Sequence, residues 1–241
     1  MKTPLRIIAL ITTCIATASV VSAAEESTTP MPRMTEYSWM SIAEWYRRHA
    51  DDVEAAAKGD ARLVFAGDSI TQIWEGSPAY QRDFEKFNPV NLGVGGDRTE
   101  NLLWRLQHGG EGNLDPEVVV LLIGVNNLGQ RHDTPEAVFH GVRANLNELK
   151  NAFPSAKILL LGVFPFEESP DSPVRGDVKQ VNLLIRSFAD DRVTVMDVGD
   201  IFLEKDGSIS KDILGDFLHP TPAGYERLDA AILPTLTSWL E

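Results

Sequence analysis

The sequence predicts an α/β fold in which a single domain is built on one parallel sheet. Several runs of Val, Ile and Leu, such as the run from Val118 to Ile123, are continuously apolar, which is typical of strands buried on both faces. Stretches with helical spacing separate these runs, and this alternation implies right-handed crossovers between parallel strands. No internal repeat and no second type of composition follow residue 34, so residues 35–241 are expected to form one domain.

The predicted strands and helices alternate along the chain. Five strands are expected at residues 62–66, 90–92, 118–123, 157–163 and 193–196. Helices are expected at residues 35–58, 79–87, 99–107, 135–152, 178–189 and 222–240. Asp97 followed by Glu100 suggests a capping box at the start of the third of these helices.

The first 24 residues have the pattern of a secretory signal peptide. Lys2 and Arg6 precede an apolar stretch that ends in small residues at positions 21–24. An uncleaved membrane anchor is the rival interpretation, but the stretch contains Ser and Thr hydroxyls and is only marginally long enough to span a bilayer. A secreted or periplasmic protein is therefore expected, without stable membrane insertion after cleavage. Residues 25–34, rich in Ser, Thr and Pro, are expected to form a linker.

Charge and cysteine content exclude several functions. The formal net charge is −13, and it becomes −15 when the two cations Lys2 and Arg6 are removed with the signal peptide. Such acidity argues against nucleic-acid binding and against docking on anionic membranes. The only cysteine, Cys14, lies within the signal peptide. The mature chain is therefore expected to have no disulfide, no thiol nucleophile and no thiolate metal site.

A candidate nucleophile follows the first predicted strand. The sequence Gly67-Asp68-Ser69 ends an apolar run, and helix-compatible residues come next. The carboxyl ends of strands in open α/β sheets are where ligands usually bind, so a serine hydroxyl there is well placed to react. Gly-Asp-Ser is also common turn chemistry, so the remaining loops must supply a base, an orienting group and oxyanion donors.

Three later loops at the same predicted sheet edge contain these groups. Gly96 lies in a glycine-rich turn whose N–H could face a ligand, and Asn126 could donate its side-chain amide to a developing negative charge. Asp216 and His219 are separated by two residues just before the last predicted helix, so the carboxylate can reach the imidazole Nδ1 and leave Nε2 for a serine. Each motif alone has a structural explanation, but their coincidence at one edge predicts a serine hydrolase. A Gly-x-Ser-x-Gly sequence is absent, which argues against an α/β-hydrolase.

The order Gly-Asp-Ser, Gly, Gly-x-Asn, Asp-x-x-His resembles that of the SGNH, or GDSL, family of serine esterases. Within that family, the sequence around these motifs resembles that of the catalytic α-subunits of platelet-activating-factor acetylhydrolase. This resemblance extends over roughly residues 60–240. The resemblance implies a flavodoxin-like three-layer αβα sandwich with a five-stranded parallel sheet, the SGNH hydrolase fold. It also implies a triad of Ser69, Asp216 and His219, and an oxyanion hole made by the N–H groups of Ser69 and Gly96 and by Asn126. Neither a metal nor a cofactor is expected.

The expected reaction is hydrolysis of short, acetyl-type carboxylic esters through an acyl-enzyme. The signal peptide departs from the intracellular relatives and favours acetylated carbohydrates, including polysaccharides, or small esters as substrates. A phospholipid or lysophospholipid acylhydrolase is the alternative, and a non-catalytic carbohydrate-binding relative is a weaker one. Homodimers are expected only because the resembled subunits pair. Asp68, Asn127, Phe164 and Leu218 are further candidates for substrate binding.

Histidines outside the Asp-x-x-His motif are expected at the surface. His49, His108, His132 and His140 are scattered among polar residues and lack metal-ligand spacing.

Overall fold

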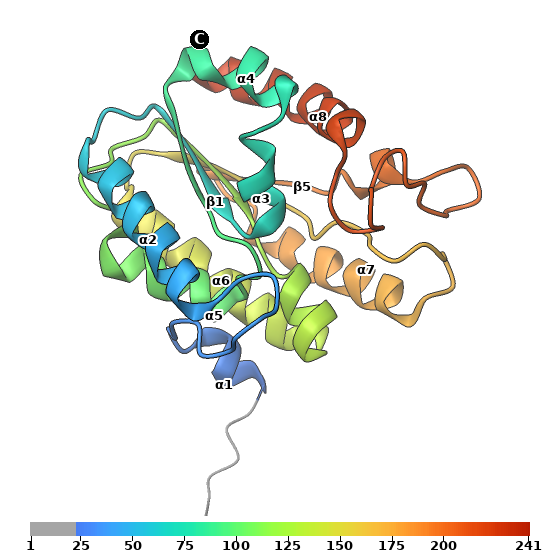
Figure 1. Ribbon diagram of the computed structural model, residues 1–241. Helices are drawn as coiled ribbons and strands as arrows, with labels where there is room; N and C mark the ends of the chain where they lie inside the picture. Colours follow the sequence, from blue (N-terminus) through green and yellow to red (C-terminus); the bar gives the residue numbers. More distant parts are fainter. Residues whose placement is uncertain (1–22) are drawn as a thin grey trace, which may run out of the picture.

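The computed structural model describes residues 23–241, in which helices cover both faces of one parallel sheet (Figure 1). The sheet has the strand order β2-β1-β3-β4-β5, and every neighbouring pair is parallel. This is the flavodoxin-like order of doubly wound folds. The five strands are β1 (Leu63–Gly67), β2 (Pro89–Gly93), β3 (Val118–Leu122), β4 (Lys157–Leu161) and β5 (Val193–Met196). The prediction of a three-layer αβα sandwich with a five-stranded parallel sheet is confirmed.

Helices form an outer layer on each face of the sheet. Figure 1 shows α3, α4 and α8 on one side of the sheet and α5, α6 and α7 on the other. Their bounds are α3 (Ser69–Trp74), α4 (Pro78–Phe84), α5 (Thr99–Arg105), α6 (Pro135–Ala152), α7 (Pro173–Ile185) and α8 (Pro222–Leu240). All five residues of β1 and of β3 are buried, as the unbroken apolar runs predict.

The N-terminal part of the described chain differs from the prediction. Residues 25–34 are not a free linker: α1 (Ala23–Thr28) packs on α5 and α6, and the side chains of Ser27 and Arg33 are buried. The predicted helix 35–58 begins only at α2 (Ile42–Ala57), because Ser41 caps it by accepting a hydrogen bond from Glu44 N. Residues 1–22, and with them Cys14 and most of the predicted signal peptide, lie outside the described residues.

Other boundaries move by a few residues. The helix predicted at 178–189 begins earlier, at α7, where Pro173 occupies the first turn, and ends in a short 3₁₀ turn (Arg186–Phe188). Within residues 23–241, no helix is both long enough and apolar enough to cross a membrane.

Candidate active site

Ser69 stands at the carboxyl end of β1, where the strand turns directly into α3. The turn is tight: a Cβ on Gly67 would lie 2.4 Å from Leu122 O, so only glycine fits there. Asp68 caps α3, because its Oδ1 accepts a hydrogen bond from Ile70 N at 3.0 Å. Strand, glycine and cap together hold the Ser69 side chain at the sheet edge.

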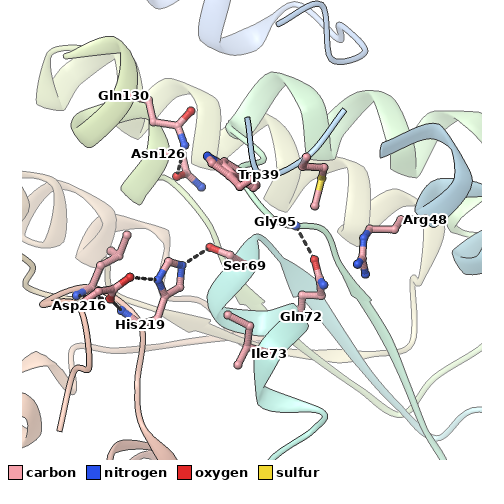
Figure 2. A pocket seen from close by; sticks show the side chains of 13 residues that line it. Trp39, Arg48, Ser69, Gln72, Ile73, Gly95, Asn126, Gln130, Asp216 and His219 are labelled. Carbon is pink, nitrogen blue, oxygen red and sulfur yellow. Dashed lines mark hydrogen bonds and ion pairs between the residues drawn. The ribbon is translucent and has the colours of Figure 1, made fainter. Parts of the chain in front are cut away.

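Ser69, His219 and Asp216 form a continuous hydrogen-bonded relay (Figure 2). His219 Nε2 lies 2.8 Å from Ser69 Oγ, and His219 Nδ1 lies 2.7 Å from Asp216 Oδ2. The side chains come from loops 147 or more positions apart in the sequence, and they meet because both loops lie at the same sheet edge. The relay has the nucleophile, base and orienting carboxylate of a serine hydrolase in hydrogen-bonding order.

Asp216 is held as a carboxylate by its own loop. Its partial burial would raise its pKa, but hydrogen bonds from the backbone and the imidazole of His219, and from Leu218 N, outweigh this and lower the pKa. Phe217, between them, has a φ of +65°, a left-handed conformation that is uncommon for a bulky residue. The loop therefore keeps its strained shape while fixing an ionised acceptor behind His219.

Gly96 follows β2 and brings a backbone N–H to the cleft. Its φ is +73°, and a Cβ there would lie 2.5 Å from Trp39 Cη2. Among residues 23–241, no acceptor is found for Gly96 N–H or for Ser69 N–H. Both donors are therefore available to a ligand.

The Asn126 amide completes this set of donors. Asn126 is buried after β3, and its Nδ2 donates to Asp97 O at 2.9 Å. Its Oδ1 accepts from Gln130 Nε2 at 2.7 Å. An amide nitrogen carries two hydrogens, so the second N–H remains for a ligand in the cleft that Asn126 lines.

These groups open into a cleft of about 520 Å³, within the range of small-molecule sites. Trp39, Ile73 and Leu218 give its walls apolar surface, while Gln72, Gln130 and Arg48 give polar surface. Figure 2 shows His219 and Asp216 on one side of Ser69, and Gln72 and Arg48 on the other.

Of the four further candidates for substrate binding, only Leu218 lines the cleft. The other three, expected to bind substrate, are instead buried and do not line it. Asp68 is fully buried as the cap of α3. Asn127 accepts a hydrogen bond from Thr99 N and donates one to Asp133 Oδ2, which ties α5 to the turn after β3. Phe164 packs against Phe202 with 4.7 Å between ring centroids, so it belongs to the core.

Several cleft residues were missed by sequence reasoning. Gln72 lies one turn after Ser69 on α3 and accepts a hydrogen bond from Gly95 N at 2.7 Å. Gln130 lies four residues after Asn126. Both positions follow helical spacing from a candidate site residue, and this signal could have identified them. Trp39, 57% exposed, comes from a segment without such a signal.

The predicted capping role of Asp97 and Glu100 is wrong. Asn101 instead accepts a hydrogen bond from Arg98 N at the start of α5. The Asp97 carboxylate is fully buried and accepts hydrogen bonds from Arg105 Nε at 2.7 Å and Trp45 Nε1 at 2.6 Å. It therefore anchors the loop that carries Gly96 to α2 and α5.

His49, which was expected at the surface, is buried. Its ring lies 5.2 Å from that of Trp104, and burial together with nearby Arg105 lowers its pKa to about 4. Within the described part of the chain, no group of three or more His, Cys, Asp or Glu side chains is placed to bind a metal ion. The expected absence of a metal remains a prediction.

Comparison with known proteins finds a family whose sequences match most of this chain. The model of the GDSL-like Lipase/Acylhydrolase family matches residues 65–227. The alpha2 subunit of platelet-activating factor acetylhydrolase IB from Rattus norvegicus is 32% identical over 186 residues, covering 76% of this chain and 80% of the relative.

Two solved structures share the fold. A GDSL-like lipase from Bacteroides thetaiotaomicron has a TM-score of 0.66 and 22% identity, over 80% of this chain and 97% of that one. A catalytic mutant of an acetylxylan esterase from Geobacillus stearothermophilus has a TM-score of 0.58 and 20% identity, over 73% and 94%.

Proposed function

The chain belongs to the GDSL-like lipase/acylhydrolase family and is a carboxylic ester hydrolase, and we propose that Ser69 is its nucleophile. The observation that carries the proposal is the relay in which Ser69 Oγ lies 2.8 Å from His219 Nε2 and Asp216 lies 2.7 Å behind the ring. A serine hydroxyl reacts at neutral pH only when an adjacent base removes its proton, and this geometry supplies one.

The proposed reaction proceeds through an acyl-enzyme. Ser69 Oγ attacks the ester carbonyl carbon while His219 Nε2 takes the hydroxyl proton, and Asp216 stabilises the resulting imidazolium. The tetrahedral oxyanion accepts hydrogen bonds from Ser69 N–H, Gly96 N–H and Asn126 Nδ2. The carbon–oxygen bond to the alcohol then breaks, and His219 passes its proton to the leaving oxygen. Water, deprotonated by His219, releases the carboxylic acid and regenerates Ser69.

We propose short acyl groups, acetyl above all, on carbohydrates or small alcohols as the substrates. The names of the curated relative and of the esterase that shares the fold both refer to acetyl esters. A cleft of about 520 Å³ with a mixed polar and apolar lining suits an acetylated sugar or small ester. Secretion or export to the periplasm, and pairing into homodimers, also remain proposals.

Phospholipid or lysophospholipid hydrolysis is the second candidate. It is favoured by the 32% identity to platelet-activating factor acetylhydrolase subunits. The net charge of −13 counts against approach to anionic lipid surfaces, although it leaves soluble or zwitterionic lipids open.

Replacement of Ser69 tests the nucleophile. Ser69→Ala should fold normally, lose labelling by a fluorophosphonate probe, and hydrolyse p-nitrophenyl acetate several orders of magnitude more slowly, because no other group forms the acyl-enzyme. Mass spectrometry of the wild-type protein should find one fluorophosphonate adduct, on Ser69. Near wild-type turnover by Ser69→Ala would contradict the proposal.

Substrate class is tested by comparing kcat/KM values. Rates should fall from acetyl to butyryl to octanoyl aryl esters, and acetylated xylan should release acetate faster than a phosphatidylcholine with an acetyl group at its second position. Rates that rise with acyl length would exclude the proposed preference for short acyl groups. Faster release of acetate from the lipid would favour phospholipid hydrolysis.

A further inference from the structure

Residues 31–41, here called the strap, form a non-helical segment that turns back on itself between Tyr37 and Met40 and lines the cleft with Trp39 and Met40. The strap precedes the residues matched by the family model, which begin at residue 65. We propose that the strap positions two of the three oxyanion donors, Gly96 N–H through Arg33 and the Asn126 amide through Tyr37. This inference rests on the proposed function, because it concerns the donors named there.

Arg33 acts on Gly96 through a shared peptide unit. The buried guanidinium of Arg33 donates from Nη2 to Gly95 O at 2.5 Å. Gly95 O and Gly96 N–H belong to the same trans peptide, so they point in opposite directions. Holding the carbonyl against Arg33 therefore turns the N–H away from the strap and toward the cleft. Gln72 fixes the preceding peptide by accepting from Gly95 N.

A chain of hydrogen bonds fixes the Asn126 amide from the other side. Asp97 O can only accept, so Asn126 must present Nδ2 to it and Oδ1 to Gln130. Gln130 must then donate from Nε2, which leaves its Oε1 to accept from Tyr37 OH at 2.6 Å. Every bond has only one possible direction. The chain therefore allows one orientation of the Asn126 amide, the one with N–H toward the cleft.

Packing within the strap connects Arg33, which contacts Gly95, to Tyr37, which begins the hydrogen-bond chain to Asn126. The rings of Tyr37 and Trp39 stack with 5.0 Å between centroids and 4° between planes. The Arg33 guanidinium carbon lies 5.1 Å from the centre of the Tyr37 ring, a cation–π distance. Trp39 in turn contacts Gly96, where a Cβ would strike its ring. Arg33, Tyr37 and Trp39 thus form one packed unit against Gly95 and Gly96.

Gln130→Glu is the decisive variant because it replaces the amide N–H that donates to Asn126 Oδ1 with a carboxylate oxygen, which can only accept. A carboxylate cannot donate to Asn126 Oδ1, so the amide must either flip or face a repelling oxygen. We expect kcat for p-nitrophenyl acetate to fall about 10- to 100-fold, less than the roughly 10²- to 10³-fold expected for Asn126→Ala, with KM changed less than about threefold. Gln130→Ala, which removes the donor without adding an acceptor, should lose less than Gln130→Glu.

A double-mutant cycle separates positioning from a merely structural role. If Gln130 acts through Asn126, then Gln130→Glu should lower kcat by less than about twofold in the Asn126→Ala background. An equal loss of kcat in both backgrounds would overturn the proposal.

The strap is tested by Tyr37→Phe, which deletes only the hydroxyl. It should lower kcat about two- to fivefold without lowering the Tm by more than about 1 °C, because the stacked ring remains. An acetyl-type trifluoromethyl ketone forms a serine adduct that carries an oxyanion. Its inhibition constant should rise by the same factor, because the oxyanion is bound less tightly. Met34→Ser, at a position of the strap that is 72% exposed, is the matched control and should change neither value.

The Ser69 variant and the strap variants separate a wrong nucleophile from a wrong role for the strap. If Ser69→Ala abolishes turnover but Tyr37→Phe and Gln130→Glu both retain wild-type kcat, only the strap proposal is wrong. If Ser69→Ala retains turnover, the proposed function itself is wrong.

Discussion

Gly96 joins backbone geometry, packing and chemistry at one position. It needs a φ of +73° that side chains rarely adopt, and its α-carbon faces the ring of Trp39 and the guanidinium of Arg33. Gly96→Ala should therefore destabilise the protein by about 1–3 kcal/mol and lower kcat at least tenfold, because the loop must shift to admit the methyl group. Denaturant unfolding and hydrolysis of an aryl acetate measure the two effects.

Gly176 offers a matched control for this substitution. It lies exposed in α7, and a Cβ there would meet no atom within 4 Å. Gly176→Ala should stabilise the protein by roughly 0.5–1 kcal/mol through helix propensity and leave kcat unchanged. Equal losses of stability and activity in the two variants would show that Gly96 has no special role.

Among individual residues, the sequence identified those that belong to a recognisable catalytic pattern. It did not show which side chains are buried and which face the cleft. Ser69, Asp216 and His219 could be identified because each follows a predicted strand or precedes a predicted helix, and the structure brings them together. Phe164 and Asn127 also follow strands, but their side chains turn into the core rather than the cleft. Which way a side chain turns is decided by packing against distant segments, and no local pattern contains that information.

At the scale of elements, strands and long helices were predictable because their apolar periodicity is strong. α1 and the start of the strap were not, because Ser, Thr and Pro give residues 25–34 no periodicity, and residues 35–41 were instead assigned to the helix that follows them. Their partners lie far along the chain: Ser27 Oγ donates to Asp133 Oδ2, 106 positions later, and Arg33 donates to Gly95 O, 62 positions later. The sequence of a segment that is held only by such distant contacts looks like that of a linker, because its partners become neighbours only in the folded protein.

Limited proteolysis distinguishes a docked strap from a linker. The side chain of Arg33 is 2% exposed and donates a hydrogen bond to Gly95 O, so trypsin should cut after Arg33 only when the strap detaches. Lys58, exposed at the end of α2, is the internal reference. Time-resolved mass spectrometry should find cleavage after Lys58 before cleavage after Arg33. Rapid early cleavage after Arg33 would restore the linker interpretation.

At the scale of the whole molecule, burial disfavours the ionised form of several carboxyl groups in this acidic chain. Burial raises the pKa of Asp52, Asp68 and Asp229 to about 7 in each case, with Arg105 opposing the shift at Asp52, Ile70 N at Asp68 and Trp74 at Asp229. They lie on α2, at the end of β1 and on α8, so the effect belongs to the assembled layers and not to one site. The sequence shows the acidity but not which acids become buried.

These groups predict that acidification from pH 8 stabilises the protein. Between the unfolded pKa of about 3.8 and the folded pKa of about 7, the folded state holds a proton that the unfolded state has lost, so stability falls as pH rises through this window. His49 acts in the opposite direction: its folded pKa of about 4 removes stability as pH falls below about 6.5. The raised carboxyl groups outnumber His49 throughout this window, so the Tm should keep rising as the pH falls from 8 toward about 4.

Asp229→Asn isolates one contribution to this pH dependence. Asn keeps an oxygen that accepts the 2.7 Å hydrogen bond from Trp74 Nε1, but it cannot ionise. The free energy of unfolding of the variant, measured against that of the wild type, should therefore improve on the order of 1–3 kcal/mol between pH 5 and pH 8. Glu226→Gln, which removes an exposed carboxylate of the same helix with a lowered pKa, should show almost no change over this range, because that carboxylate is ionised in both the folded and unfolded states above pH 5. A difference between Asp229→Asn and wild type that is independent of pH would mean that Asp229 stays ionised inside the fold.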